Sequence, residues 1–372
     1  MKIGFIASGN IHDRTLWSGT ISFLADALAR NNTIIPLGKK SAFLGLCNRA
    51  LSIMTRRKIT RSILAHRLET HQLTRKIHQA NCDVLFAPAA SELIADVDLP
   101  DGRPLVYLSD ATFHVMNGYY APLQTGHDQR FLEHCEASSL RKAAAVILSS
   151  QWAADDAIRH YGCQPEKVHV LPFGANLPDQ LDLEKKRNPQ DDNTVRLLLV
   201  GVDWKRKGVD IAIDTVRLLN QHSTTTTYEL TIIGFSGPQT PQNGDPHVRY
   251  MGRLNKNNPE ELQRMVDVYQ SSDIFILPTQ AECAGIVFSE AAMYALPVIT
   301  YATGGTTTYV QDGVTGSCLK PGSSAEEFAK AIDGIISGGK LSEYAANART
   351  KYEQELNWDT WLSSFSEILH LL

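Results

Sequence analysis

The sequence predicts an α/β protein in which two doubly wound, parallel-sheet domains follow one another along the chain. Continuous apolar runs alternate with amphipathic segments in both halves, which is typical of buried parallel strands that each lead into a helix. A charged stretch that is poor in apolar residues, 179–193, lies between the halves and indicates a linker. The chain has 372 residues, enough for two domains of ordinary size.

The composition excludes several functional classes. Hydrophobic residues make up 43% of the chain and charged residues 20%, as expected for a globular protein. The formal net charge of -4 excludes a globally basic nucleic-acid binder. The six cysteines are widely spaced, which argues against a zinc site or a disulfide framework and favours a reducing compartment. Because residues 1–7 indicate a short strand rather than a signal peptide, and no apolar run approaches ~20 residues, we expect a cytoplasmic protein.

The first half begins with a strand at 2–7, a polar loop that ends at Gly19, and a helix from Thr20, which together form half of a nucleotide-binding unit. The loop lacks the Gly-x-Gly-x-x-Gly pattern, so a dinucleotide site has little support. Further strands are predicted at 83–87, 104–108, 143–149 and 168–172, with a helix at 152–161.

Two candidate catalytic residues follow the strand at 104–108. Asp110 comes almost directly after it, and His114 lies one turn further on. Sites in open parallel sheets gather at the carboxyl ends of the strands, so either side chain could face a substrate. A polar helix cap and a surface histidine are the alternative interpretation.

Residues 38–80 form a basic segment, in which ten Lys and Arg residues oppose the single acid Glu69 and apolar residues are interleaved. Such a segment could rest on an anionic membrane surface or hold an anionic acceptor. We therefore expect possible peripheral contact with the inner face of a membrane. The alternative is a solvated helix face.

The second half opens with an apolar strand at 195–200, followed by a glycine-bounded loop, 201–208, that contains three successive cations. Arg206 and Lys207 are the candidates to hold an anion of high charge density, because a guanidinium binds phosphate oxygens in pairs and Lys adds a point charge. A strand at 228–234, a turn at 248–254 and a helix at 261–269 follow.

The stretch from Pro278 to Pro297 carries two carboxylates beside a helix start. It follows a buried strand at 274–277, and Ala284 and Gly285 open a helix of small residues that stops before Pro297. Glu282 precedes the helix and Glu290 lies inside it. The intervening amides belong to a helix N-terminus, a natural anion site, and are those of Cys283, Ala284, Gly285, Ile286 and Val287.

This stretch resembles the retaining, GT-B-fold glycosyltransferases of family four. Their signature is a Glu pair eight residues apart, then a helix and a Pro-Val-Ile strand, which Glu282, Glu290 and 297–299 match; Gly304-Gly305 also fits. The resemblance implies two facing doubly wound domains with a cleft between them and a C-terminal helix that crosses back. It implies an acceptor-binding domain at 1–176, with 354–372 packed on it, and a donor-binding domain at 194–353.

The resemblance also implies roles for the site residues. Glu282 would hold hydroxyls of the donor sugar and Glu290 the donor ribose, while Arg206 and Lys207 would clamp the pyrophosphate. Gly19 matches a glycine in the loop that closes over the diphosphate, and Arg253 lies in the turn next to the nucleotide base. The family's usual His aligns with Asp110 here, so Asp110 takes that position or His114 reaches it from the next turn.

The predicted activity is a retaining hexosyl transfer from a UDP- or GDP-sugar to a glycan, glycolipid or small-molecule acceptor. We expect no catalytic metal, because the only Asp-x-Asp, Asp96–Asp98, lies outside both phosphate segments, and no cofactor beyond the nucleotide sugar as co-substrate. An epimerase or phosphorylase on the same fold is the main alternative, and a non-catalytic sugar-nucleotide binder is another. A hydrolase that uses the Glu pair is disfavoured, since eight residues on one helix span ~12 Å and hydrolases need roughly 5 to 9.5 Å.

Overall fold

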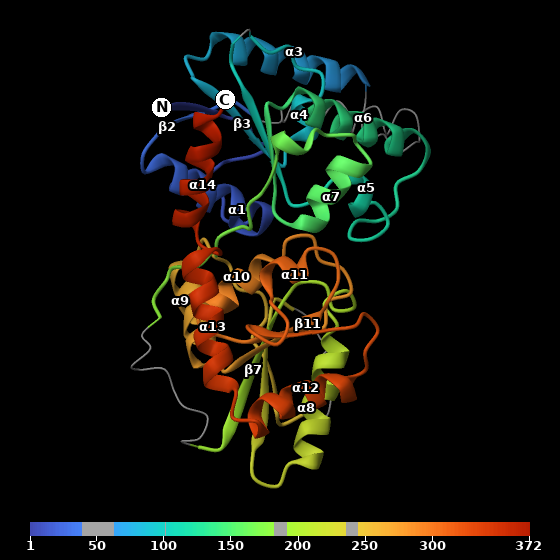
Figure 1. Ribbon diagram of the computed structural model, residues 1–372, viewed down its shortest axis with the longest axis vertical. Helices are drawn as coiled ribbons and strands as arrows, with labels where there is room; N and C mark the ends of the chain where they lie inside the picture. Colours follow the sequence, from blue (N-terminus) through green and yellow to red (C-terminus); the bar gives the residue numbers. More distant parts are fainter. Residues whose placement is uncertain (39–62, 101, 182–191, 236–244) are drawn as a thin grey trace. The chain divides into compact units, whose positions relative to one another are not determined.

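The computed structural model describes residues 1–38, 63–100, 102–181, 192–235 and 245–372 (Figure 1). This part of the chain divides into two compact units. The first comprises Met1–Leu171 and Leu362–Leu372, and the second Pro172–Trp361. Each unit contains one six-stranded sheet in which every pairing is parallel, so the predicted α/β class is confirmed.

The sheet of the first unit has the strand order β2-β1-β3-β4-β5-β6. Its central strands are fully buried, as their continuous apolar sequences require. The strand at 33–36 was not predicted, because it is an edge strand whose residues are at most half-buried. The strands are β1 (Lys2–Phe5), β2 (Thr33–Pro36), β3 (Val84–Pro88), β4 (Leu105–Ser109), β5 (Ala145–Leu148) and β6 (Val168–Val170).

Helices cover both faces of this sheet. Right-handed crossovers place α1 on one face and α3, α4, α6 and α7 on the other, since the chain reverses direction across the sheet after β2. The helices are α1 (Thr20–Ala29), α3 (Ile63–Gln79), α4 (Ser91–Ile94), α5 (Phe113–Met116), α6 (Gly126–Lys142) and α7 (Gln151–Arg159), with 3₁₀ turns η1 (Leu16–Gly19) and η2 (Pro165–Lys167).

The sheet of the second unit has the order β12-β11-β10-β7-β8-β9. Here too the order of the strands across the sheet reverses. Strands β8 and β9 are added on one side of β7, and β10 then pairs with the other side of β7. The strands are β7 (Thr194–Val200), β8 (Thr227–Ile233), β9 (Val248–Tyr250), β10 (Ile274–Leu277), β11 (Val298–Tyr301) and β12 (Gly316–Leu319).

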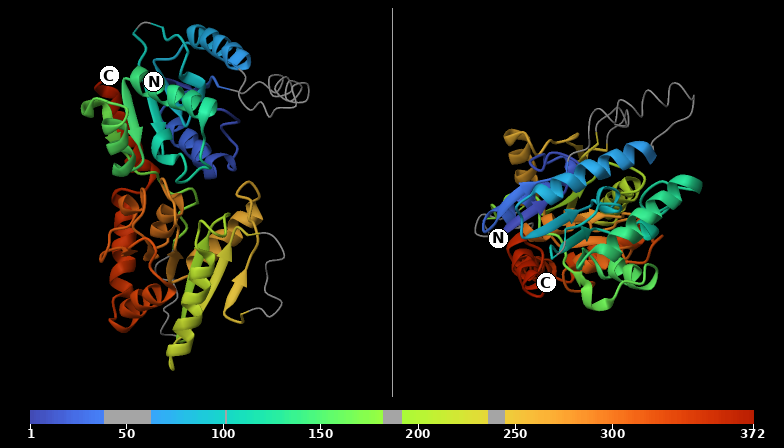
Figure 2. Two further views of the ribbon diagram at one scale, coloured as in Figure 1. Left: turned by 90° about the vertical axis from the view of Figure 1, so that its right-hand side faces the viewer. Right: turned by 90° about the horizontal axis from the view of Figure 1, so that it is seen from above.

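The reversal also separates the helices of the second unit into two layers. Helices α8 and α12 pack against each other on one face, and Figure 2 shows α8 lying along the strands of the sheet. Helices α9 and α10 belong to the other face, where α13 packs on α10. The helices are α8 (Val209–His222), α9 (Pro259–Ser271), α10 (Ile286–Met293), α11 (Thr306–Tyr309), α12 (Ala325–Ser337) and α13 (Leu341–Gln354).

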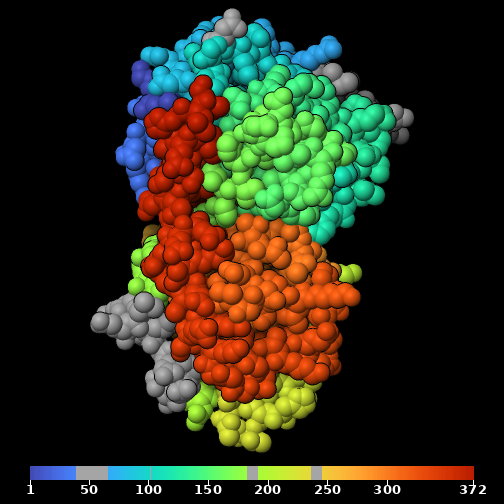
Figure 3. All heavy atoms as spheres, in the orientation of Figure 1, coloured from blue at the N-terminus to red at the C-terminus, as the bar shows by residue number. Residues whose placement is uncertain are grey.

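The last helix, α14 (Trp358–His370), belongs to both units. Its first turn lies in the second unit, where the indole N–H of Trp358 donates to the carbonyl of Ala175 at 3.0 Å. From Leu362 it belongs to the first unit, where the Phe365 ring meets Phe86 edge-on at 5.2 Å. The predicted return of the C-terminal helix to the first domain is therefore confirmed. The C-terminal helices, red in Figure 3, form part of the surface on the face drawn.

A carboxyl group is buried beneath the sheet of the first unit. Glu136 of α6 is 3% exposed and accepts hydrogen bonds from the Tyr107 hydroxyl at 3.1 and 3.2 Å. Burial, which disfavours the charged form, raises the pKa of Glu136 to about 8. Because that folded-state pKa lies above the unfolded value, the contribution of Glu136 to stability falls as the pH rises from about 4.5 to about 8.

We therefore expect Glu136→Gln to stabilise the protein more at pH 9 than at pH 5. The amide avoids the cost of a buried charge, and each unit of pKa shift corresponds to ~1.4 kcal/mol. Thermal unfolding at the two pH values measures the difference, with the exposed Glu166→Gln as a control. An equal change in melting temperature at both pH values would show that Glu136 does not titrate with a raised pKa.

Candidate functional site

Two loops of the second unit meet where the strand order reverses. Strands β7 and β10 are neighbours in the sheet, so the loops that follow them, 201–208 and 278–285, lie side by side at its carboxyl edge. The backbone N–H of Gln280 donates to the carbonyl of Arg206 at 2.7 Å, and the Thr279 hydroxyl donates to the same carbonyl at 3.3 Å. This edge is the expected place for a ligand in an open α/β sheet.

Glycines allow these loops to approach closely. Gly208 has φ +64°, and a Cβ there would lie 2.2 Å from the carbonyl oxygen of Pro278. A Cβ on Gly234, after β8, would lie 1.8 Å from the carbonyl oxygen of Gly201. Any side chain at these positions would force the backbones apart. The two glycines therefore hold the cationic loop 201–208 close to the residues that follow β8 and β10.

The Lys207 ammonium donates to the Glu282 carboxylate inside this packed edge. The two side chains are only 8% and 7% exposed. The Arg206 guanidinium lies 3.9 Å from the same carboxylate oxygen and donates to the carbonyl of Ala281 at 3.0 Å. Two residues that the sequence analysis assigned to phosphate and one assigned to sugar thus meet at one point.

Helix α10 begins beside this ion pair. It starts at Ile286, one or two residues later than predicted, with Gly285 as a left-handed N-cap at φ 70°. The amides of Ile286 and Val287 therefore belong to its first turn, where N–H groups have no partner within the helix, whereas Cys283 and Ala284 lie in the turn before it. The turn after β11 also reaches this place, because the N–H of Gly305 donates to the carbonyl of Glu282 at 3.0 Å.

Glu290 lies one turn into α10 and is only 1% exposed. One carboxylate oxygen accepts from the Lys256 ammonium at 2.5 Å, and the other accepts from the Tyr269 hydroxyl at 3.0 Å. Burial, and then the negative charge of Glu290, raise the pKa of Tyr269 well above its usual value, so it remains a hydroxyl donor. Arg253 is exposed, in the loop after β9 that also carries Lys256.

In the first unit, Asp110 is held by the loop that follows β1. The indole N–H of Trp17 donates to an Asp110 carboxylate oxygen at 3.1 Å. Trp17 and Ser18 have left-handed backbones, with φ 48° and 57°, and Gly19 follows at φ 91°. A left-handed conformation is unfavourable for the two non-glycine residues, so the surrounding structure holds this loop in a strained form.

His114 belongs to a different cluster from Asp110. It lies in the short helix α5, and its Nδ1 is 2.7 Å from a carboxylate oxygen of Asp156, on α7. Its ring is stacked on that of His160 at a centroid distance of 3.7 Å. Both candidate residues thus lie beyond the carboxyl end of β4, as predicted, but with separate partners.

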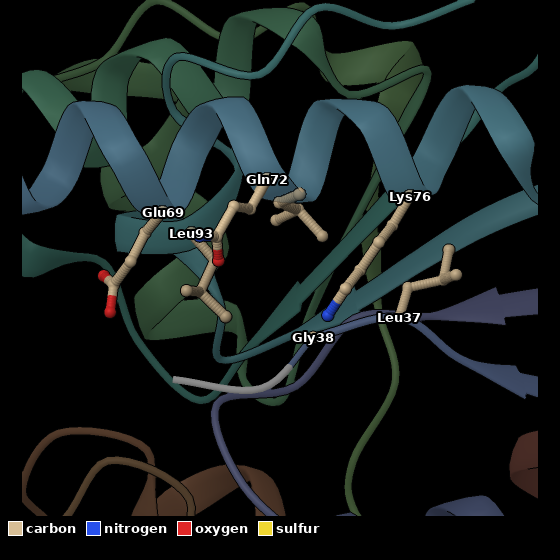
Figure 4. A pocket seen from close by; sticks show the side chains of 7 residues that line it. Leu37, Gly38, Glu69, Gln72, Lys76 and Leu93 are labelled. Atoms are coloured by element: carbon tan, nitrogen blue, oxygen red, sulfur yellow. The ribbon is translucent and has the colours of Figure 1, made fainter. Parts of the chain in front are cut away.

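A shallow pocket lies at the same edge of the first sheet, between α3 and the residues after β2 (Figure 4). Leu37 and Gly38 form one side, and Glu69, Gln72 and Lys76 of α3 extend toward it from above. Gln72 and Lys76 are exposed, so the pocket is an open groove rather than an enclosed cavity.

Comparison with known protein families assigns both halves of the chain. The model described as Glycosyl transferases group 1 matches residues 181–352, and the model described as Glycosyltransferase Family 4 matches residues 49–178. The chain belongs to the family 4 glycosyltransferases. The two matched regions meet near the boundary between the two compact units. The site around Lys207 and Glu282 lies in the matched region 181–352, within the second unit.

Relatives of the chain include D-inositol 3-phosphate glycosyltransferase from Rhodococcus jostii, which is 25% identical over 60% of the chain and 52% of the relative. Lipopolysaccharide glucosyltransferase WaaG from Escherichia coli is 24% identical over 56% of the chain and 57% of the relative. The chain thus spans about half the length of the curated relatives it matches.

Solved structures show that the chain has the GT-B fold. Sucrose-phosphate synthase from Thermosynechococcus elongatus matches with a TM-score of 0.72 at 16% identity, covering 100% of this chain and 98% of that one. Anabaena Alr3699/HepE, in complex with UDP and glucose, matches with a TM-score of 0.67 at 19% identity over the full length of both chains.

The sequence analysis missed four residues that hold the candidate residues in place. They come from distant segments: Trp17, Asp156, Lys256 and Tyr269. Lys256 had the clearest signal, since it is a cation two residues after the turn at 248–254, which the family resemblance placed next to the nucleotide base. The others carry no local pattern, because only the fold brings them to their partners.

The buried ion pair between Lys207 and Glu282 leads to a prediction about stability. Lys207→Met leaves the buried Glu282 carboxylate without its ammonium, which should cost about 3 to 5 kcal/mol. The double variant Lys207→Met/Glu282→Leu should recover most of that loss, because both charges are gone. The midpoint of urea unfolding checks both, and the exposed Lys205→Met is the matched control. Unchanged unfolding in the single variant would show that the two charges are well solvated.

Proposed function

We propose that this protein is a retaining, metal-independent hexosyltransferase that uses a nucleotide-diphosphate sugar, with UDP as the favoured nucleotide. The observation that carries the proposal is the convergence of Lys207 and Arg206 at the Glu282 carboxylate, shortly before α10 begins at Ile286. Positive groups and helix amides suit a diphosphate, and a carboxylate beside them suits sugar hydroxyls.

The diphosphate would gain negative charge as it leaves the sugar. Lys207 and Arg206 would then exchange part of their attraction to Glu282 for the phosphate oxygens, together with the amides of Ile286 and Val287. Donors fixed in advance at the place where charge develops stabilise a transition state without having to reorganise. Glu282, freed from part of its pairing, would accept hydrogen bonds from the sugar.

Glu290 would hold the ribose of the donor. Its carboxylate is covered by Lys256, whose side chain is 14% exposed, so the ribose hydroxyls would reach it after the ammonium moves aside. Tyr269 would keep its hydrogen bond and fix the carboxylate during this exchange. Arg253, exposed in the same loop as Lys256, would meet the nucleotide near its base.

The first unit would bind the acceptor, and Asp110 or His114 would contact the reacting sugar. The groove beside α3 offers the acceptor hydrogen-bonding groups from Glu69, Gln72 and Lys76 above an apolar wall. The Asp-x-Asp sequence has other partners. The carboxylate oxygens of Asp96 lie 2.8 Å from the ring nitrogen Nε2 of His66 and 2.9 Å from Nε2 of His134. Metal independence is therefore part of the proposal.

The comparisons favour this activity over the alternatives. The names of the relatives describe glycosyl transfer, and the Anabaena neighbour was crystallised with UDP-glucose. An epimerase or phosphorylase on the same fold is the second candidate, and turnover of a nucleotide sugar without an acceptor would expose an epimerase.

Membrane contact through the basic segment stays a prediction. Residues 39–62, which contain most of its cations, lie outside the described residues. On the described part of α3, Arg67, Arg75 and Lys76 are exposed, and Leu68 is 46% exposed. No helix in the described ranges is both long and apolar enough to cross a bilayer.

A thermal-shift panel of UDP, GDP, ADP and their sugars tests the donor. A true ligand at 100 times its Kd should add ~2.7 kcal/mol of stability. Arg206→Ala and Lys207→Ala should each weaken diphosphate binding, since a hydrogen bond to a charged group contributes roughly 1.5 to 3 kcal/mol. Unchanged calorimetric affinity in both variants would remove loop 201–208 from the site.

The two glutamates should have separable effects. Glu282→Gln should lower turnover by ~10²- to 10³-fold with nucleotide affinity nearly unchanged, because it removes a contact made in the transition state. Glu290→Gln should instead weaken binding of the bare nucleotide. The exposed Glu343→Gln is the control and should change neither. The reverse pattern, with nucleotide binding lost in Glu282→Gln and turnover intact, would contradict the assignment.

A further inference from the structure

Helix α7 and the two residues that follow it, His160 and Tyr161, hold the turn that carries His114 at three points. The backbone N–H of His114 donates to the Tyr161 hydroxyl at 3.1 Å. Its ring Nδ1 lies 2.7 Å from Asp156 Oδ1, and its ring face is stacked on His160 with the planes 8° apart. Contacts to the backbone, the edge and the face of one residue fix both its position and the rotation of its ring.

Asp156 is itself fixed by the same turn. Its second carboxylate oxygen accepts a hydrogen bond from the hydroxyl of Thr112, the residue that precedes α5. Thr112 is fully buried, and the Asp156 side chain is only 10% exposed. The carboxylate therefore has one oxygen directed at Thr112 and the other at His114, and it has little freedom to rotate.

This arrangement decides which nitrogen of His114 carries the proton. An ionised carboxylate is only an acceptor, so the neutral ring must carry its hydrogen on Nδ1 to bond Asp156. The lone pair then lies on Nε2, which makes no hydrogen bond within the described residues, and the side chain is 49% exposed. A half-exposed imidazole with its basic nitrogen open is suited to accept a proton or a substrate hydroxyl.

The stacked partner has a carboxylate of its own. His160 Nε2 lies 2.9 Å from Glu133 Oε1, and Tyr161 meets the His160 ring edge-on at 4.7 Å. Burial, followed by the charges of Glu136 and Glu133, raises the pKa of Tyr161 well above its usual value, so it stays a hydroxyl. His160, paired with Glu133, thus packs against the face of the His114 ring. Asp156 is the residue that sets the tautomer of His114.

We propose that Asp156 is a positioning residue that holds His114 with its proton on Nδ1 and its Nε2 lone pair open to the substrate. The structure therefore favours His114, rather than Asp110 alone, as a group that contacts the reacting sugar or the acceptor hydroxyl. The consequence for turnover rests on the proposed function, whereas the tautomer of His114 does not.

Histidine-selective ¹⁵N NMR of the full chain tests the tautomer without any ligand. The signals of His114 are identified by their absence in His114→Gln. Wild type should show His114 with the proton on Nδ1, and Asp156→Asn should lose that form, because the Thr112 hydroxyl favours the amide oxygen on its own side and turns the NH₂ toward the ring. Asp155→Asn is the matched control, since Asp155 is a neighbouring acid of α7 that bonds Gln151 and Arg159 instead. A proton on Nε2 in wild type overturns the proposal.

Turnover of UDP-glucose, followed as UDP release, tests the consequence. Asp156→Asn should lower kcat on the order of 100-fold, as His114→Gln does, with KM for UDP-glucose within about twofold, because general-base or hydroxyl-orienting groups contribute ~10²- to 10⁴-fold. Asp155→Asn should keep the wild-type rate. Full activity in Asp156→Asn with its tautomer changed overturns the role of Asp156. If wild type releases no UDP, the proposed use of UDP-glucose fails, and the NMR result alone decides whether Asp156 positions His114.

Discussion

The buried ion pair between Lys207 and Glu282 is the interaction on which the site of the second unit depends. Removing two charges from water is costly, and the mutual attraction offsets that cost only when the geometry is closely held. Backbone contacts hold the geometry of this ion pair. Gly208 lies against Pro278, Gly234 lies against Gly201, and the N–H of Gln280 donates to the carbonyl of Arg206. A strand order that reverses between β7 and β10 brings those segments together.

The same design recurs at Glu290, where Lys256 and Tyr269 occupy both carboxylate oxygens. In each case an acidic residue in or before α10 is paired with a lysine from a different loop. Such pairs keep a carboxylate oriented inside the protein. Under the proposed function, Lys207 would transfer part of its attraction from Glu282 to the anionic diphosphate, and the ribose hydroxyls would take the place of Lys256 at Glu290.

The fold was predictable from sequence because its signals are local and repeated. Buried parallel strands such as 195–200 and 274–277 are continuous apolar runs, and each is followed by an amphipathic helix. The edge strand β2 lacked such a run, since Thr33–Pro36 is half-exposed, and it was missed. The α10 start was placed one or two residues early, because the left-handed Gly285 ends the turn rather than opening the helix.

The residues of the candidate site were predictable only where both their chemical type and their spacing in the sequence indicate a site. Glu282, Glu290 and the cations of loop 201–208 satisfy that condition. Their partners do not: Lys256 is 34 residues from Glu290 in the chain, and Asp156 is 42 residues from His114. Contacts of this kind depend on which strands are neighbours, and a single sequence does not state that order.

A crystal structure of the protein with UDP tests the central claim most directly. The account predicts diphosphate oxygens within hydrogen-bond distance of the Lys207 ammonium and the first amides of α10, with the ribose hydroxyls at Glu290 and Lys256 moved off that carboxylate. UDP bound elsewhere, with the Lys207–Glu282 and Lys256–Glu290 pairs both unchanged, would contradict it.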